Sequence, residues 1–362
     1  MTPCNHSPER PEDDQVGKSP TTGAGPLVAA GSSGPCAPWP FDPQARLCRR
    51  AFVKTAASAA AAVGATVVAS ATLTPAAALA AEPRSKTAWV DVNVSLSRWP
   101  LRRLAQDEAP ALVASLRKQG VSQAWAGSFD GLLHKDLAAV NAQLTDDCRR
   151  HSAGLVLPFG SVNPAAPDWE EELRRCATRH RMPGIRLHPN YHGYGLDSPA
   201  FARLLRLATD LGLIVQLALV MEDERMMHPR LRVAPVDPAP LAEIVKQIPG
   251  LRLILLNALT ALRGKRLSDL LAAGEIYVEI AMLEGVAGIE TLLRDIPARR
   301  LLFGSHAPLF YFEAAALKLK ESVNEPATLE QIRAGNTQRL LATRPAKEVK
   351  QASNGLTKES RT

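Results

Sequence analysis

The chain lacks the short motifs that mark several common protein classes. It has only five cysteines in 362 residues and no Cys-x-x-Cys pair, so neither a zinc ribbon nor a thioredoxin-type redox site is expected. No Gly-x-Gly-x-x-Gly sequence follows the first apolar run of the folded region, which leaves a dinucleotide-binding fold without support. The 43 basic and 36 acidic residues are interspersed rather than gathered in a basic stripe, and we therefore expect no nucleic-acid partner.

Apolar material is plentiful, but it is unevenly distributed. Hydrophobic residues make up 46% of the chain, which excludes wholesale disorder and allows at least one large core. Residues 1–48 are instead rich in Pro, Gly, Ser and Thr and show no apolar periodicity, as is typical of a disordered segment. The tail 344–362 is rich in Lys, Ser and Asn and is expected to be disordered as well.

Residues 49–80 resemble a twin-arginine export signal. Arg49 and Arg50 precede an uncharged run rich in Ala and Val, and an Ala-Leu-Ala sequence ends at Ala80. A cationic start binds the anionic cytoplasmic leaflet, the weakly apolar run enters a translocase, and small residues suit a signal peptidase. We expect cleavage near Ala80 and a periplasmic or secreted protein that meets the membrane only during export. The alternative is an uncleaved membrane anchor, for which the small residues are poorly suited.

Residues 86–343 contain eight short apolar runs that alternate with longer amphipathic segments. Runs that are apolar on both faces fit parallel strands covered by helices. Eight such strand–helix units predict an α/β fold, a (β/α)8 TIM barrel, with an open doubly wound sheet as the runner-up. The predicted strands are 89–94, 122–126, 155–162, 184–188, 214–220, 251–257, 276–281 and 301–304.

Polar residues follow these runs, and the chemistry of a TIM barrel lies at the carboxyl ends of its strands. The site is therefore expected among these residues. In chain order they are Asp91, Asn93, Ser95, Asn163, Arg186, His188, Gln216, Glu222 to Arg225, Asn257, Glu279 and His306. Cys148 and Cys176 fall in helical patterns and are expected to be packing residues, with a disulfide left open.

Four stretches of this domain resemble the amidohydrolase-related branch of the amidohydrolase superfamily: 91–95 (DVNVS), 184–189 (GIRLHP), 303–308 (FGSHAP) and 335–340 (GNTQRL). The resemblance implies a distorted TIM barrel that in many members binds one divalent metal. The ligands in those members are a His-x-His pair on the first strand, histidines on the fifth and sixth, and an aspartate on the eighth. The corresponding positions here hold Asn93, Ser95, Gln216, Asn257 and His306.

None of these five positions keeps the ligand that the family uses. Imidazole and carboxylate bind zinc strongly, whereas amide and hydroxyl oxygens are weak neutral ligands. We therefore predict no metal at this place and expect the amide and hydroxyl side chains to hydrogen-bond a polar substrate. A different zinc or manganese site, rebuilt from His188, His192, His228 and His306, is the alternative.

The superfamily also contains barrels that hydrolyse lactones without a metal, and the resemblance implies similar chemistry here. His306 would be the general base, since an unperturbed imidazole has a pKa of ~6.5. His188 would polarise a carbonyl group, and Asp91 is the third residue assigned to the catalytic group. The alternative for Asp91 is an ion pair with Arg186 inside the barrel mouth.

The remaining candidates are assigned to substrate binding. Arg186 and Arg225 would hold an anionic or polyhydroxylated substrate. Tyr191 and His192 lie in the loop after the fourth strand, and an aromatic side chain there would stack on a ring or cover the barrel top.

These features predict an exported hydrolase that cleaves a C–O or C–N bond. Its substrate would be a lactone, ester or amide of a small polar or carboxylated molecule, and its reaction would need no metal. Two alternatives stay open: a non-catalytic barrel that binds a ligand, and a lyase of the decarboxylase type, because decarboxylases share this barrel. The sequence does not determine the oligomeric state.

Overall fold

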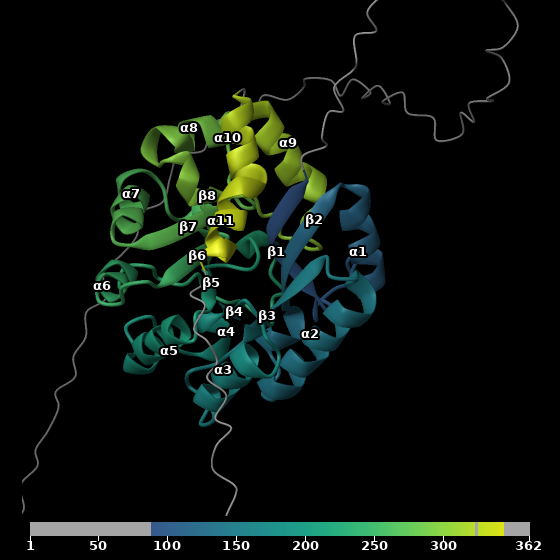
Figure 1. The fold of residues 1–362 in the computed structure, drawn as a ribbon, viewed down its shortest axis with the longest axis vertical. Coiled ribbons are helices and arrows are strands. Elements are labelled where there is room, and N and C mark those ends of the chain that lie inside the picture. Colours follow the sequence, from purple (N-terminus) through teal and green to yellow (C-terminus); the bar gives the residue numbers. More distant parts are fainter. Residues whose placement is uncertain (1–87, 323–324, 344–362) are drawn as a thin grey trace, which may run out of the picture. The chain divides into compact units, whose positions relative to one another are not determined.

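The computed structural model describes residues 88–322 and 325–343. Within them eight parallel strands form one sheet in sequence order, from β1 to β8. The strands are β1 (Trp89–Leu96), β2 (Val121–Ser128), β3 (Val156–Ser161), β4 (Gly184–Leu187), β5 (Ile214–Ala218), β6 (Arg252–Leu256), β7 (Glu275–Glu279) and β8 (Leu301–Leu302). Figure 1 shows them arranged around a common centre with the helices outside.

The ring of strands is completed by hydrogen bonds between β1 and the segment that begins with β8. The amide of Val92 donates to the carbonyl of Phe303 over 3.0 Å, and the amide of Ser95 donates to the carbonyl of Ala307 over 2.9 Å. These bonds continue the parallel pairing beyond the two residues of β8 itself. The structure thus confirms the predicted (β/α)8 TIM barrel.

Each strand is followed by at least one helix or helical turn. The helices are α1 (Ala109–Lys118), α2 (Leu137–Ser152), α3 (Trp169–Thr178), α4 (Pro189–His192), α5 (Pro199–Asp210), α6 (Leu241–Lys246), α7 (Gly264–Ala272), α8 (Gly288–Asp295), α9 (Phe312–Ser322), α10 (Pro326–Glu330) and α11 (Asn336–Ala342). Helix α5 shows how the local sequence determines a helix. Pro199 occupies its first turn, where the missing N–H of proline is not needed for a hydrogen bond. Its buried residues recur every three or four positions, at Phe201, Leu204, Leu205 and Ala208, and so form one apolar stripe.

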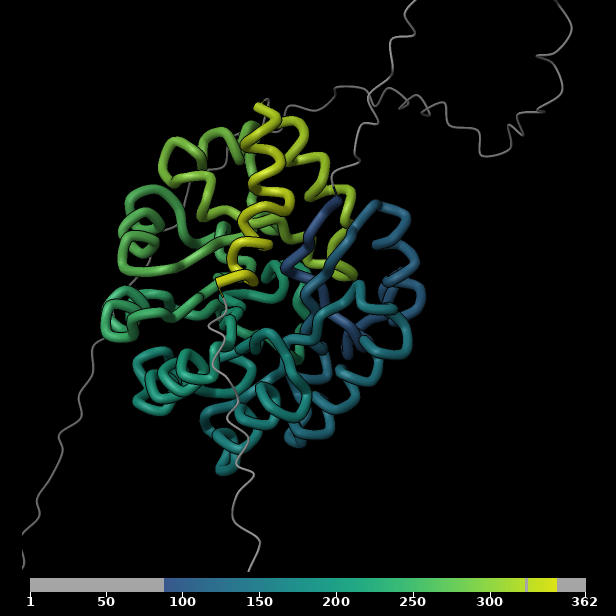
Figure 2. The backbone as a smooth tube through the Cα atoms, in the orientation of Figure 1, coloured from purple at the N-terminus to yellow at the C-terminus, as the bar shows by residue number. Residues whose placement is uncertain are grey.

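The apolar core forms two layers. The larger layer lies between strands and helices, as in Leu253 and Leu255 of β6. A smaller inner cluster contains Trp125 and Phe159, whose rings stack at 4.9 Å, together with Leu340 of α11. Figures 1 and 2 show α11 across one end of the ring. Apolar side chains thus fill the inside of the barrel next to α11.

Some predicted boundaries differ from the structure. The strand predicted over 301–304 is shorter in the structure, where β8 spans only Leu301–Leu302. Helix α2 begins at Leu137, where the Asp136 side chain caps it by accepting from the amide of Ala139 over 2.9 Å. A π-helical turn (Gln331–Gly335) connects α10 to α11. Cys148 and Cys176 are buried free thiols. The predictions for 1–48, 49–80 and 344–362 lie outside the described residues.

Within residues 88–322 and 325–343, no helix is both long enough and apolar enough to cross a bilayer.

Candidate functional site

A group of polar side chains is buried in the barrel, and most of them come from the ends of strands. Each is 3% exposed or less. Buried polar groups are normally hydrogen-bonded, so their partners reveal how the site is built. The group consists of Asp91, Asn93, Ser95, Arg186, His188, Gln216, Asn257, Glu279, Ser305 and His306.

Glu279, the last residue of β7, organises one half of this group. Its carboxylate accepts from the backbone amides of Asn257 and Ala281, each over 2.6 Å, and from the Asn93 side-chain amide over 3.2 Å. Asn93 also donates to the side-chain oxygen of Asn257 over 2.9 Å. Burial raises the pKa of Glu279 above its ordinary value, and the hydrogen bonds oppose this shift. Glu279 therefore orients the Asn93 side chain directly, and Asn93 in turn binds the side chain of Asn257.

His306 is held in one tautomer by its neighbours. Its Nε2 lies 2.8 Å from the carbonyl oxygen of Met221 and 3.4 Å from the side-chain nitrogen of Asn257. A carbonyl oxygen only accepts, so the shorter contact assigns the proton to Nε2 and the lone pair to Nδ1. Within the described residues, Nδ1 is buried without a hydrogen-bond partner. The geometry leaves one nitrogen able to take up a proton.

Burial also sets the charge of His306. It lowers the pKa of the ring to about 4, with a smaller contribution from the charge of Arg186, while the bond to Met221 acts in the opposite direction. The ring is therefore neutral near pH 7. His306 has a positive φ of 60°, an unusual conformation for a residue other than glycine and one that is concentrated at functional sites.

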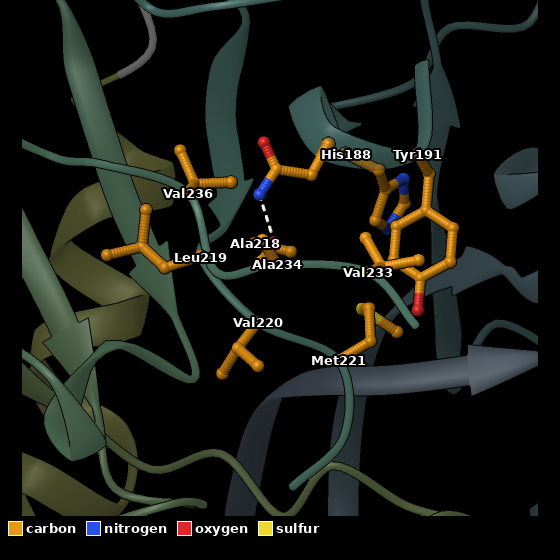
Figure 3. Close-up of a pocket in the computed structure, with 10 residues that line it drawn as sticks. His188, Tyr191, Ala218, Leu219, Val220, Met221, Val233, Ala234 and Val236 are labelled. Atoms are coloured by element: carbon orange, nitrogen blue, oxygen red, sulfur yellow. Dashed lines mark hydrogen bonds between the residues drawn. The ribbon is translucent and has the colours of Figure 1, made fainter. Parts of the chain in front are cut away.

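His188 lies beside a small pocket between the loops that follow β4 and β5 (Figure 3). Tyr191 of α4 lines the same pocket, and most of the other lining residues are apolar, among them Val220 and Met221. Asn190 donates to the carbonyl of Ala234 and so joins the two loops. Burial lowers the pKa of His188 well below its usual value, and its Nδ1 has no partner among the described residues.

Two contacts connect this pocket wall to the catalytic candidates. The carbonyl of Val220 accepts from the Asn257 side chain over 2.8 Å, and the carbonyl of Met221 accepts from His306. One short segment after β5 therefore touches His306, Asn257 and the pocket.

The structure does not bring together all the predicted residues. Arg225 was expected to hold substrate, but its side chain is 82% exposed and its guanidinium binds Asp223. His192 donates from Nε2 to the carbonyl of Gly131 over 2.7 Å, and its ring centre lies 6.1 Å from that of His188. His228 is exposed. These positions could not be predicted from the amino-acid sequence, because the direction of a loop side chain depends on contacts with residues distant in the chain.

Arg186 and Asp91 also differ from expectation. All five N–H groups of Arg186 donate to protein oxygens, among them those of Gln216 and Ser95. The predicted alternative of an Arg186–Asp91 ion pair is wrong, because the hydroxyl of Ser305 and two backbone amides bind Asp91 instead.

The donor set does not fit a divalent metal. Four of the five positions at which the family's ligands would lie carry neutral amide or hydroxyl groups, and these groups already bond to one another, to Glu279 or to Arg186. The described residues contain no cluster of three or more His, Cys, Asp or Glu side chains placed to hold a metal ion. Neutral oxygens that are already hydrogen-bonded are weak ligands for zinc or manganese.

The closed ring of strands and its buried polar residues define a TIM-barrel protein. Sequence comparison gives the family, since residues 99–343 match the amidohydrolase family. The chain belongs to this family, whose superfamily consists of enzymes. A comparison with curated protein sequences finds no match.

Several solved structures share the fold. A 2,6-dihydroxybenzoate decarboxylase from Rhizobium has a TM-score of 0.56 at 14% identity, over 71% of this chain and 99% of that one. A 5-carboxyvanillate decarboxylase from Sphingomonas paucimobilis has a TM-score of 0.55 at 12% identity, over 71% and 99%. A dihydroxybenzoic acid decarboxylase from a Polaromonas species, with bound manganese and 2-nitroresorcinol, has a TM-score of 0.53 at 12% identity, over 71% and 97%. At these identities the likeness shows the fold alone.

Three parts of the site were missed by sequence reasoning. Ser305 was not among the predicted site residues, although it directly precedes His306. Glu279 was expected at the rim but was given no role, although a carboxylate at the carboxyl end of a barrel strand indicates a site residue. The carbonyls of Val220 and Met221 had no signal at all, because backbone groups become site components only through tertiary contacts.

Proposed function

We propose that this protein is a small-molecule hydrolase of the amidohydrolase family that uses His306 as its general base and needs no bound metal. It cleaves the C–O or C–N bond of a lactone, ester or amide. The observation that carries the proposal is the buried, partner-free Nδ1 of a neutral imidazole whose other nitrogen is fixed by Met221.

The chemistry follows from these groups. His306 Nδ1 accepts a proton from water while the water oxygen adds to the substrate carbonyl carbon. His188, which lines the pocket beside Tyr191, polarises that carbonyl. The same His306 then returns the proton to the leaving oxygen or nitrogen.

The pocket supports a small substrate with an apolar part. Seven of its ten lining residues are apolar, and the polar ones are His188, Asn190 and Tyr191. Neither Arg186, whose donors are all used, nor the exposed Arg225 supplies a free guanidinium to this pocket. We therefore favour an uncharged carbonyl compound over the carboxylated substrates that the sequence alone favoured.

A second candidate is a lyase of the decarboxylase type. It is favoured by the fold similarity to the two decarboxylases of dihydroxybenzoate and carboxyvanillate. In that reaction a protonated His306 would donate to the ring carbon that loses carbon dioxide. A barrel that only binds its ligand is the third possibility.

Export is a separate proposal. It rests on Arg49, Arg50 and the uncharged run before Ala80, which together suit twin-arginine translocation and cleavage.

The test is a turnover assay of the purified full-length chain and its His306→Asn variant, with and without a chelator. Asparagine tolerates a positive φ and so preserves the backbone of residue 306, but it has no basic nitrogen. His134→Asn, at an exposed histidine, is the matched control. We expect hydrolysis of at least one lactone, ester or amide that survives chelation, persists in the control and falls by roughly 10²–10⁴-fold in His306→Asn.

Three other outcomes would contradict this proposal. Carbon dioxide release from hydroxybenzoates, without hydrolysis, would favour the lyase. Saturable binding without turnover would favour the binding barrel. Turnover that is abolished by chelation and restored by zinc or manganese would overturn the metal-free reaction.

A further inference from the structure

Arg186 reaches from β4 to three other strands, and its guanidinium is surrounded by oxygen atoms. Nε donates to the side-chain oxygen of Gln216 on β5 over 2.8 Å, and Nη1 donates to the hydroxyl of Ser95 on β1 over 3.2 Å. The other bonds go to the backbone carbonyls of Val94 (2.7 Å), Trp125 (3.0 Å) and Val92 (3.4 Å). All five N–H groups are thus used.

This guanidinium is a buried charge without an adjacent counter-ion. Arg186 is 2% exposed, and no carboxylate among the described residues makes an ion pair with it. Burial lowers its pKa to about 9, while the charges of Asp91 and Glu279 act in the opposite direction. The side chain keeps its proton at neutral pH, so the polar end of the barrel contains a permanent cation.

The backbone is shaped to admit this side chain. A Cβ atom on Gly127 of β2 would lie 2.8 Å from Cδ and 3.0 Å from Nε of Arg186. In addition, β1 has a register irregularity between Asp91 and Val94. Such a bulge frees backbone groups from the ladder, and the Val92 carbonyl accepts from both Arg186 and Gln216.

The position of the guanidinium matters because it contacts two of the five positions that the resemblance assigns to the family's metal ligands. Ser95 and Gln216, two of the five positions, present oxygen lone pairs to it. The other three positions, Asn93, Asn257 and His306, belong to the Glu279 and Met221 contacts. Oxygen atoms that converge from several strands form a cation-binding arrangement, and here a protein side chain fills it.

We propose that the guanidinium of Arg186 takes the place of the family's divalent cation as the fixed positive charge that ties β1, β2, β4 and β5 together. This inference shares with the proposed function only the absence of a metal, and its main readout is stability rather than turnover. It assigns Arg186 a positioning role instead of the substrate contact that the sequence favoured.

The first measurement uses the wild-type full-length chain. Zinc and manganese are quantified by mass spectrometry, and the melting temperature is measured with and without a chelator. We expect metal far below one ion per chain and an unchanged melting temperature. One tightly held ion per chain whose removal lowers the melting temperature would overturn both the inference and the metal-free reaction.

The second measurement tests the charge. Arg186→Ala deletes a fragment equivalent to ethylguanidinium, and we expect the melting temperature to fall by roughly 10 °C because buried acceptors lose their partner. Added ethylguanidinium should restore most of this loss. Ethylurea, a neutral molecule of similar size, should restore little. If Arg186→Ala does not fold alone, the same comparison is made on the yield of soluble refolded chain.

Two further variants sharpen the result. Arg225→Ala removes an exposed arginine and should respond to neither compound. Gly127→Ala should lower the melting temperature of the wild type by several degrees but that of Arg186→Ala by much less, because its clash partner is then gone. The inference fails if ethylurea restores the melting temperature as well as ethylguanidinium does, or if Arg186→Ala is as stable as wild type. It also fails if the losses in melting temperature caused by Gly127→Ala and Arg186→Ala are additive in the double variant. None of these three results bears on His306 turnover.

Discussion

Ser305 donates its hydroxyl hydrogen to Asp91 over 2.5 Å, although the two residues are 214 positions apart in the chain. Backbone amides of Asn93 and Ser305 also donate to the carboxyl group, each over 3.0 Å. This contact joins β1 to the segment after β8, directly before His306. It therefore helps to close the barrel next to His306, the candidate general base.

The first prediction concerns the protonation of Asp91. Burial raises its pKa from 3.8 to about 7, against the effect of the hydrogen bonds from Ser305. A group whose pKa is raised by folding contributes its full stability below the unfolded pKa, and this contribution is lost as the pH rises through the folded pKa. Asp91→Asn removes the titration, so relative to wild type it should gain about 2 kcal/mol of stability between pH 5 and pH 8.

Melting temperatures of both proteins across this range provide the measurement. The difference between variant and wild type should grow by roughly 5 °C from pH 5 to pH 8. Because His306 titrates in both proteins, its own effect on stability cancels in the comparison. A difference that stays constant with pH would show that Asp91 keeps its charge throughout.

The second prediction concerns Glu279. Its two oxygens accept from two backbone amides at 2.6 Å and from Asn93. Glutamine has only one acceptor oxygen, so Glu279→Gln would turn an NH2 group towards a buried amide donor. We expect a loss of about 3 kcal/mol in the free energy of unfolding, measured by urea denaturation. Glu290→Gln, at an exposed ion pair with Arg294, should change it by less than ~0.5 kcal/mol, and an equal loss would contradict the proposed organising role.

The third prediction concerns the segment after β5. Arg102, from the loop after β1, pairs with Glu222, which is 4% exposed, and this contact holds the segment across the rim beside Met221. Arg102→Met should therefore raise amide exchange over residues 219–236 by roughly fivefold, while exchange in the strands stays unchanged. Hydrogen exchange followed by mass spectrometry measures this directly. Arg225→Ala lies in the same segment and serves as the control, and an equal effect there would contradict the role of the ion pair.

The fourth prediction concerns export. Replacing Arg49 and Arg50 by lysines keeps the positive charge but removes the arginine pair. We expect uncleaved precursor to accumulate in the cytoplasm and the mature form to disappear from the exported fraction, as followed by immunoblotting. Unchanged export of the double variant would mean that residues 49–80 are not a twin-arginine signal.

The barrel itself could be predicted because its signal is local. Runs such as 214–220 and 251–257 are apolar on both faces, and the amphipathic stretch that became α5 has one buried stripe. Local periodicity depends on neighbouring residues only, so one sequence is enough to read it. The position of His306 in the site followed from the same strand assignment.

The hydrogen-bond partners could not be predicted in this way. Asn93, Asn257 and Glu279 are distant in sequence, yet they form one network. Arg186 was expected to face substrate, and instead its five donors are used inside the barrel. Which way such a side chain turns depends on the bulge in β1 and the space left by Gly127, neither of which has a local signature.

The sequence by itself determined the alternation of strands and helices, and it led to the prediction that five rim positions lack the metal-binding residue types of the family. Only the tertiary structure decided that Arg186 is an internal cation, that Arg225 lies on the surface, and that His306 offers Nδ1. The physical reason is that periodicity is a property of adjacent residues. A tautomer or a buried charge, in contrast, is fixed by acceptors that other strands and loops bring to it.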